Sequence, residues 1–570
     1  MTSCSQITVS PLRSPHPRAL LATASIAVAL AAADTYVVVL ALTDMMAGVG
    51  LGVDALQKAT PIISGFLLGY VAVLPLIGRL ADLVDRQKVL LGCLAVFVVG
   101  SSITALAVEL PVLVAGRIIQ GVGGGGLVPA TLAIVAALWP AERRGLPLGV
   151  VGAVQELGSV LGPLLGAFVL AVATWRMIFW LNAAAGLVLA IAVTASGGVQ
   201  LRRPRPAVLL LTLLAVASCG LALAAPDALV TSVVLGVPFV PFGDATSALA
   251  TPIGALAAIL AAAALAVGAR ALLPVLRRVD LVGALLVGGA LGSVILTFAA
   301  ADPAREVVGP LGFALLPLAG ILLILYAVHH RRAATPLIPR GLVHGRVLWA
   351  LLVSACTGVA LVAIVVDIPL LARLVHTSSQ TEAALVLVRF LVAVPVGALL
   401  GGWSLRWIGD GVATSLGLFL NAIALALMTG WGQGAFTTAV STVVLALAGA
   451  GLGLALAPVN NAALAAAPPA EHGAVSSLVV VARMVGMVVG LALLTAAGLH
   501  QYYREVAALP SRTDPSALIG AAVVQVHWVF RGAAIASVLG ALAALTLGVR
   551  PRRENGAMNG TRLEPPVRMT

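Results

Sequence analysis

The stretch from Gly149 to Ala167, GVVGAVQELGSVLGPLLGA, places one ionisable residue, Glu156, among apolar residues and closely spaced glycines. A carboxylate inside a membrane helix is costly, so such residues usually belong to ion pathways, proton relays or ion pairs. Small residues at these intervals let a neighbouring helix backbone approach closely, and a proline can bend the helix. The residues of this predicted helix-packing pattern are Gly149, Gly158, Gly162, Pro163 and Gly166.

A second ionisable residue, Arg483, stands at a related position later in the chain. VPATLAIVAALWPAERRG at 128–145 matches APVNNAALAAAPPAEHG at 457–473, which indicates an internal repeat. Following each copy into the next helix brings Glu156 almost level with Arg483, near the midplane where transporters with such repeats bind. The two residues either couple or gate transport, or hold the halves together by pairing.

Three more polar residues lie in apolar segments: Asp34 in ALAAADTYVVVLAL, and Arg117 and Gln120 in LVAGRIIQGVGGGG. Burial disfavours the charged form of a carboxyl group, whereas a nearby cation favours it. A helix movement can bring the carboxyl group of Asp34 or Glu156 close to an arginine or away from it. The carboxyl group can therefore take up a proton on one side of the membrane and release it on the other. For Asp34, proton carriage, substrate contact and structural pairing all remain open.

Other residues contribute less specific signals. The predicted contacts to substrate are Gln120, Gln155, Asp367 and Arg389. The histidines lack metal-ligand spacing and no P-loop is present, so we expect neither a metal nor a cofactor. Gly121 to Gly126 spell G-x-G-x-x-G, but no strand precedes them, so we do not expect nucleotide binding.

The composition sets the class of protein. Of 570 residues, 61% are hydrophobic and 9% charged, and the mean hydropathy is +1.11, which indicates a polytopic membrane protein. Apolar segments of about 20 residues, each long enough to cross a bilayer, recur along the chain. They predict an all-α fold with sixteen spans, fourteen being the alternative. The predicted division is 1–200 for a first six-helix half, 201–340 for about four inserted helices, 341–550 for a second six-helix half and 551–570 for a tail.

The net charge of +12 reflects topology more than partners. Most of the lysines and arginines fall in alternate connecting segments, which therefore share one side, as the positive-inside rule requires. Both termini are thus expected in the cytoplasm, and no nucleic-acid partner is expected. The apolar run around Asp34 is long enough for a full span, which argues against a cleaved signal.

The motifs resemble those of one known family, the major facilitator superfamily. GRLADLVDRQKVLL resembles its signature loop, a conformational latch that here contains Gly78, Asp82, Arg86 and Lys88. Leu83 and Asp85 depart from that pattern. The segment around Glu156 resembles the fifth-helix motif of the drug:proton antiporter branch, with Ala167 as its departure. The resemblance implies that Arg117 takes part in proton transfer.

Within that superfamily, DTYVV, QELGSVLGP, WRMIFWLN and VVVARMVGM resemble a mycobacterial family of triacylglyceride and drug exporters. The segment that begins near Ala474 continues through Tyr502 and Tyr503, so it forms either a helix projecting beyond the membrane or an extended loop. If it projects, the resemblance implies a role in guiding a lipid or in meeting an envelope lipoprotein. The pair of segments near 208–270 has no counterpart in a fourteen-span exporter.

The sequence therefore predicts a multi-pass cell-membrane protein that exports lipidic or amphiphilic compounds, coupled to protons, by alternating access. The expected partners are membrane lipids, a small amphiphilic or lipid substrate, protons and an envelope lipoprotein. A multidrug:proton antiporter with no lipid role is the alternative within this class. A polytopic enzyme would need a catalytic pair of polar residues at helical spacing, which we do not find, and a scaffold would not need Glu156 and Arg483.

Overall fold

The computed structural model describes residues 16–52, 56–197, 206–232, 236–243, 247, 249–276, 278–299, 312–509 and 514–549. The predicted tail at 551–570 lies outside these residues. All the regular structure in the described part is helical. The α-helices are α1 (Pro17–Gly48), α2 (Leu56–Leu83), α3 (Arg86–Leu106), α4 (Leu110–Leu138), α5 (Gly145–Val172), α6 (Trp175–Gly197), α7 (Pro206–Ala224), α8 (Asp227–Val230), α9 (Pro252–Leu276), α10 (Leu281–Ala299), α11 (Gly312–Arg332), α12 (Gly345–Val375), α13 (Gln380–Ser404), α14 (Asp410–Met428), α15 (Ala439–Ala466), α16 (His472–Ala508) and α17 (Pro515–Ala544).

Each apolar segment of the sequence forms one of the long helices. Among the described residues, fourteen helices are long and apolar enough to cross a membrane. Two shorter apolar stretches, Pro252–Gly268 in α9 and Leu281–Thr297 in α10, account for the remaining two segments. The prediction of an all-α, multi-pass membrane protein is therefore confirmed.

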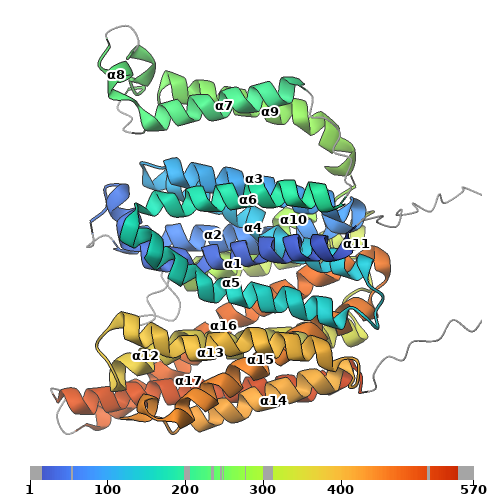
Figure 1. The fold of residues 1–570 in the computed structure, drawn as a ribbon, viewed down its shortest axis with the longest axis vertical. Coiled ribbons are helices and arrows are strands. Elements are labelled where there is room, and N and C mark those ends of the chain that lie inside the picture. Colours follow the sequence, from blue (N-terminus) through green and yellow to red (C-terminus); the bar gives the residue numbers. More distant parts are fainter. Residues whose placement is uncertain are drawn as a thin grey trace, which may run out of the picture.

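The long helices run side by side in two bundles, α1 to α6 and α12 to α17 (Figure 1). Both ends of the described chain, near Pro17 and Val549, lie at the same end of these bundles, which we name the tail end. The opposite end is named the far end. The two bundles are the halves to which the site residues belong.

Glycine contacts repeat between the halves. In α4, a Cβ atom on Gly121 would lie 2.1 Å from the carbonyl oxygen of Phe66 in α2. In α15, a Cβ atom on Gly449 would lie 2.2 Å from the carbonyl oxygen of Phe390 in α13. Such distances are possible only without a side chain, so glycine is required at both places. The internal repeat of the sequence thus corresponds to the same helix packing in each half.

The halves touch each other over the tail-end portions of their helices. A Cβ atom on Gly402 of α13 would lie 2.4 Å from the carbonyl oxygen of Gly145 in α5, and one on Gly473 of α16 would lie 2.2 Å from that of Gly78 in α2. Farther along α5, toward the far end, Phe168 and Val172 are exposed, as is Val392 of α13. The described molecule is therefore closed at the tail end.

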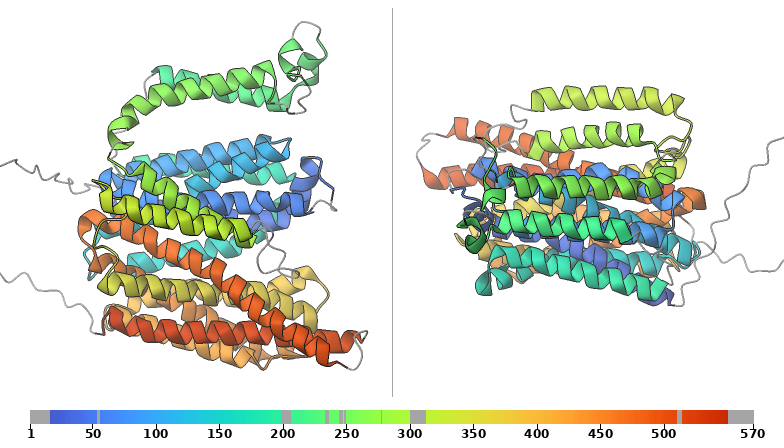
Figure 2. Two further views of the ribbon diagram at one scale, coloured as in Figure 1. Left: turned by 180° about the vertical axis from the view of Figure 1, so that it is seen from behind. Right: turned by 90° about the horizontal axis from the view of Figure 1, so that it is seen from above.

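The helices inserted between the halves form two hairpins. α10 and α11 pack together, and α10 lies against α2 and also touches α16. α7 and α9 pack against each other and stand apart from the main body, where α7 makes a small contact with α3 (Figure 2). The first hairpin therefore covers one seam between the halves, whereas the second is peripheral.

Candidate functional site

Asp34 forms the centre of a buried polar network in the first half. One of its carboxylate oxygens lies 2.6 Å from a guanidinium nitrogen of Arg117, and both side chains are about 1% exposed. The other oxygen accepts hydrogen bonds from the side-chain amides of Gln120, at 3.0 Å, and Asn182. Gln120 in turn donates to the hydroxyl of Ser101 at 2.9 Å. The carboxylate is therefore both ion-paired and hydrogen-bonded, as a buried charge must be.

Five helices position this network, because α1, α3, α4 and α6 supply its side chains and α2 supplies a backbone carbonyl. Arg117 donates from its Nε to the carbonyl oxygen of Ile62 at 3.3 Å. Its guanidinium also lies 4.5 Å from the ring centroid of Phe66 and 5.7 Å from that of Phe179. The faces of the two aromatic rings stabilise the guanidinium cation and shield it from water. The network therefore ties the first half together internally.

The second half lacks this network. Gly486 packs on Ala355 in the way that Gly158 packs on Ala29, so the position equivalent to Asp34 is Ala360. By the same reasoning, the glycine contacts of α4 and α15 make Leu445 equivalent to Arg117. The Asp34–Arg117 pair therefore has no counterpart in the second half of a pseudo-symmetric molecule, although other charged residues are buried there.

Glu156 and Arg483 form the ion pair that spans the two halves. Oε1 of Glu156 in α5 lies 4.0 Å from a guanidinium nitrogen of Arg483 in α16, with side chains 9% and 11% exposed. This separation is much longer than that of Asp34 and Arg117. Among the described residues, the side chain of Glu156 accepts one hydrogen bond, at 3.4 Å from the side-chain amide of Gln155. Each residue lies 11 positions from the start of its helix, which corresponds to a depth of roughly 16 Å. The pair is thus loose and lies near the middle of both helices.

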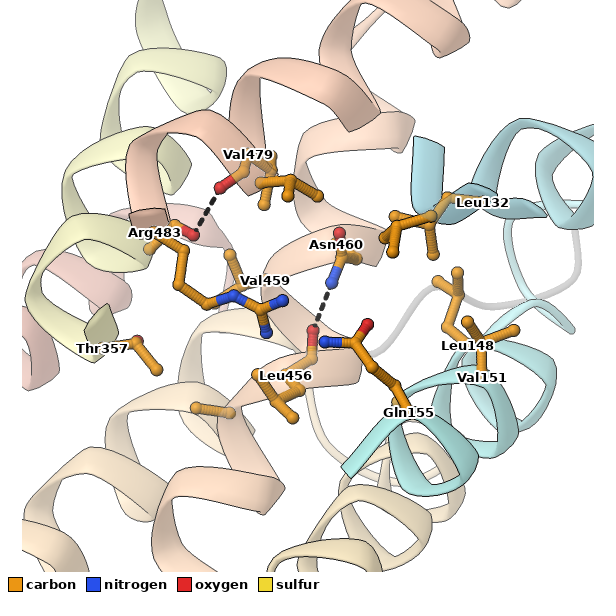
Figure 3. A pocket seen from close by; sticks show the side chains of 15 residues that line it. Leu132, Leu148, Val151, Gln155, Thr357, Leu456, Val459, Asn460, Val479 and Arg483 are labelled. Carbon is orange, nitrogen blue, oxygen red and sulfur yellow. Dashed lines mark hydrogen bonds between the residues drawn. The ribbon is translucent and has the colours of Figure 1, made fainter. Parts of the chain in front are cut away.

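Both residues of this pair line a cavity between the halves. One part of the cavity includes Glu156, Arg483 and Tyr70 in its wall. The adjoining part includes Arg483 and Gln155 (Figure 3). Its other polar lining residues are Ser354, Thr357 and Asn460, and the rest of its lining is mostly aliphatic. Such a cavity suits a largely apolar molecule with a few polar groups.

The predicted latch joins the halves at the tail end. The carboxylate of Asp82 in α2 accepts hydrogen bonds from the backbone N–H groups of Gly473, at 2.6 Å, and Ala474, at 2.9 Å, in the first turn of α16. Arg86 donates to the carbonyl oxygen of Pro469 at 3.1 Å. An acidic group at a helix N-terminus satisfies otherwise unpaired donors. Here the helix belongs to the other half, so the contact joins the two halves at the tail end.

Of the remaining latch residues, Gly78 belongs to the contact between the halves, whereas Lys88 does not. Gly78 lies so close to Ser477 and Gly473 that a Cβ atom would fall 2.3 Å from the serine hydroxyl. The side chain of Lys88 is exposed, and its backbone N–H contacts the carboxylate of Asp85 at 3.4 Å. Asp85 thereby caps the first turn of α3 within its own half.

The glycines of α5 serve two different neighbours. Gly149 faces Ala398 of α13 in the other half, where a Cβ atom would lie 2.7 Å from the carbonyl oxygen. Gly158 and Gly162 face α1, at 2.3 and 2.4 Å from carbonyl oxygens, and Gly166 faces the Val37 side chain of α1 at 2.5 Å. The segment thus joins the halves at the tail end and packs within its own half beyond it, and Pro163 lies inside the latter part.

Two predicted substrate contacts lie away from this cavity. Asp367 is buried in α12, and its Oδ2 has no hydrogen-bond partner among the described residues. Arg389 of α13 donates to the carbonyl oxygen of Phe436 at 3.4 Å and to the hydroxyl of Thr442 at 3.1 Å. Neither residue lines the two described parts of the cavity, whereas Gln155 does and Gln120 belongs to the Asp34 network.

Several residues of the site are not among those predicted from the sequence. Asn182 and Ser101 complete the Asp34 network, while Tyr70, Thr357 and Asn460 line the cavity. Each is a polar residue within an apolar span, which is a detectable signal. That signal does not tell which polar residues meet.

Comparison with known proteins agrees with this geometry. Residues 24–305 match the family described as Major Facilitator Superfamily. The triacylglyceride transporter of Mycobacteroides abscessus is 35% identical over 514 residues, covering 88% of this chain and 86% of that one. A probable triacylglyceride transporter of Mycobacterium bovis is 34% identical over 561 residues, covering 94% of this chain and 95% of that one.

Solved structures show the same fold at much lower identity. The human organic anion transporter MFSD10 superposes with a TM-score of 0.53 at 15% identity, covering 93% of this chain and 99% of that one. The proton:xylose symporter XylE gives 0.53 at 13% identity, covering 93% and 95%. With relatives of this similarity over nearly the whole chain, the protein belongs to the major facilitator superfamily and is a multi-pass membrane transporter, not an enzyme.

Proposed function

We propose that this protein exports lipidic or amphiphilic compounds in exchange for protons, by alternating access of the central cavity. The carrying observation is the Glu156–Arg483 pair, which bridges the halves at the cavity with a separation of 4.0 Å. When Glu156 gains a proton, its attraction for Arg483 is lost and the halves can move apart at the tail end. When the proton leaves, the pair reforms and the tail end closes.

In this proposal Asp34 and Arg117 have a different part. Their tight pair lies within one half, so its contacts do not break when the halves move as rigid bodies. We assign it to fixing α1 within the first half. Because Gly158 and Gly162 of α5 pack directly on α1, a fixed α1 in turn helps to position Glu156 of α5. Asp34 as the proton carrier is the competing assignment, and the transport assay below distinguishes them.

Orientation is part of the proposal. We place the tail end in the cytoplasm, because positive charge gathers there: helix ends and connecting segments on that side contain Arg79, Arg86, Arg144, Arg340 and Arg346. The described conformation is then closed to the cytoplasm. The membrane is proposed to be the cell membrane.

Lipidic cargo is supported by the aliphatic cavity lining and by the printed names of the relatives, which are triacylglyceride transporters. Drug efflux without a lipid role remains the second candidate, because an apolar cavity with few polar groups also suits amphiphilic drugs. A strain that lacks the protein should show altered envelope lipids if lipid export is correct. Changed drug susceptibility with unchanged lipids would favour the second candidate.

The long helices α16 and α17 suggest how a lipid leaves. α16 has 37 residues, or roughly 55 Å, against a hydrocarbon core of about 30 Å. With α17 it projects at the far end (Figure 1). We propose that this projection guides a lipid or meets an envelope lipoprotein. Gly498 and Gln525 already touch, so replacing 499–524 by a short Gly-Ser turn should preserve the fold but stop lipid export. Normal export by that variant would refute the role.

The direct test of exchange is proton flux in proteoliposomes under an imposed pH gradient. Fluorescent triacylglyceride and candidate drugs are supplied in turn to the wild type, Glu156→Gln and Asp34→Asn. We expect flux that requires substrate in the wild type, none in Glu156→Gln, and reduced but measurable flux in Asp34→Asn. Lipid movement that needs no gradient and survives both substitutions would make the protein a facilitator without proton coupling.

A further inference from the structure

The tail end of α13, together with the residues that follow it, carries an exposed cluster of two tryptophans and one arginine. The ring centroids of Trp403 and Trp407 lie 3.9 Å apart in a T-shaped arrangement, and the side chains are 45% and 51% exposed. The guanidinium carbon of Arg406 lies 5.3 Å from the ring centroid of Trp403 and 4.9 Å from that of Trp407. The arginine is thus held over two indole rings at the tail end of the bundle.

The N–H groups of Arg406 have no acceptor among the described residues. Other arginines at the tail end behave differently: Arg340 donates to three carbonyl oxygens at the end of α11, Arg144 to those of Ala136 and Trp139, and Arg86 to that of Pro469. A guanidinium offers five donors in a planar fork that matches a phosphate or a carboxylate. The indole rings of Trp403 and Trp407 therefore hold the Arg406 guanidinium in place, and its N–H donors have no acceptor among the described residues.

The cluster lies beside the seam between the halves. Gly402, one residue before Trp403, packs against Gly145 of α5, and a Cβ atom on Gly145 would lie 3.0 Å from the side chain of Leu405. Arg143 precedes Gly145 by two residues and is exposed. Both halves thus contribute positive charge to one short stretch of the surface, at the place where they touch.

Apolar side chains continue from the cluster toward the membrane interior. Leu399 and Leu400, one turn back along α13, are 41% and 47% exposed, and Leu146 of α5 is 46% exposed. A phosphate free in solution would not contact these leucines. A phospholipid has its phosphate and its acyl chains at these two neighbouring depths.

We propose that Trp403, Arg406 and Trp407 bind the phosphate of an anionic phospholipid from the leaflet at the tail end. Arg406 binds the phosphate bidentately, the indole rings support the headgroup region, and the acyl chains lie over the leucines. Arg143 of the other half adds attraction for the same anion. A lipid bound there contacts both sides of the seam, so it stabilises the closed tail end.

The test compares thermal unfolding of the purified full-length protein in nanodiscs of phosphatidylcholine alone and with phosphatidylglycerol. We expect phosphatidylglycerol to raise the unfolding temperature of the wild type, and this rise to disappear in Arg406→Gln. Arg531→Gln is the matched control, because Arg531 stacks on Trp528 at 5.2 Å on α17, away from this seam. Its response to phosphatidylglycerol should equal that of the wild type.

Two further measurements keep the result interpretable if Arg406→Gln is itself less stable. Native mass spectrometry should show that Arg406→Gln retains fewer phosphatidylglycerol molecules than Arg531→Gln. The double variant with Trp403→Leu and Trp407→Leu should also retain fewer than Arg531→Gln. Inorganic phosphate is added to phosphatidylcholine nanodiscs as a separate arm. Equal retention in all variants, or the same stabilisation by inorganic phosphate alone, would overturn the lipid site.

Discussion

Two buried carboxylates, Asp34 and Glu156, each have an arginine partner, but the physical consequences differ. Asp34 and Arg117 are in direct contact, with three helices adding hydrogen bonds, so their charges are permanently compensated. Glu156 and Arg483 are 4.0 Å apart across the two halves. Only the second pair changes its energy when the halves separate, which makes it suited to coupling a proton to a movement.

The first prediction concerns the compensated pair. Arg117→Gln should destabilise the protein by about 3–5 kcal/mol, because it leaves the buried Asp34 carboxylate without its cation. Adding Asp34→Asn should restore part of that loss, since no unpaired charge then remains. Thermal unfolding in detergent measures both effects.

Arg389→Gln provides the control, because Arg389 is half-buried and bonds to neutral oxygens. It should cost about 1 kcal/mol, the usual value for a lost hydrogen bond. Equal losses for Arg117→Gln and Arg389→Gln, or no recovery in the double variant, would contradict the assigned pairing.

At the residue scale, the sequence identifies the types of the site residues better than their partners. Asp34, Arg117, Glu156 and Arg483 stand out because ionisable residues are rare in apolar spans. The internal repeat also places Glu156 level with Arg483. Asn182 could not be paired with Asp34 in this way, because 148 positions separate them and only the packing of α1 against α6 brings them together.

At the scale of elements, backbone contact between helices is set by glycines that face a neighbour. The spacing predicts close packing for Gly149, Gly158, Gly162 and Gly166, and each of these four glycines does face a neighbouring helix. Spacing could not tell that Gly149 faces the other half whereas Gly158 and Gly162 face α1. Which helix lies opposite depends on the arrangement of the whole bundle.

A glycine substitution tests this packing. Gly158→Ala would place a Cβ atom 2.3 Å from the backbone oxygen of Ala29, so α1 and α5 must move apart. We expect a lower unfolding temperature and reduced transport. Gly92→Ala in α3 is the matched control, because nothing lies within 4 Å of its Cβ position, and it should unfold at or above the wild-type temperature. Equal behaviour of the two variants would contradict the close approach of α1 and α5.

The latch at the start of α16 gives another prediction. Asp82 accepts hydrogen bonds from two backbone N–H groups of the other half, and Asp82→Asn should weaken these bonds. The tail end should therefore open more often. Alkylation of a cysteine introduced at Ser477, which faces Gly78, should become faster. Asp85→Asn is the control, since Asp85 lies three residues away but caps α3 within its own half, and it should leave the alkylation rate unchanged. A faster rate in both variants would place the effect in the loop and not in the contact between halves.

At the scale of the whole molecule, hydropathy suffices for the helix count and the class of fold, because each apolar segment must cross the membrane as a helix. The arrangement of the inserted helices was not predictable in the same way. α10 covers the α2–α16 seam, while the α7–α9 hairpin stands apart, and both are equally apolar in sequence. Lipid and protein provide similar apolar surroundings, so composition does not distinguish a packed helix from a peripheral one.

The whole-molecule consequence of the account is that protonation of Glu156 controls which end of the cavity is closed. Val172 of α5 and Leu385 of α13 lie in the far-end portions of their helices, in different halves, and both are exposed. Spin labels at these two positions, in a background without the four native cysteines, report the separation of the halves at the far end.

The most direct measurement is the distance between these labels by pulsed electron paramagnetic resonance, as a function of pH, in the wild type and in Glu156→Gln. The account predicts a long distance at high pH that shortens in the wild type as the pH falls, because the Glu156–Arg483 pair is lost and the far end closes. Glu156→Gln should give the short distance at every pH. A wild-type distance that does not change with pH, or a Glu156→Gln variant that retains the wild-type pH response, would contradict the account.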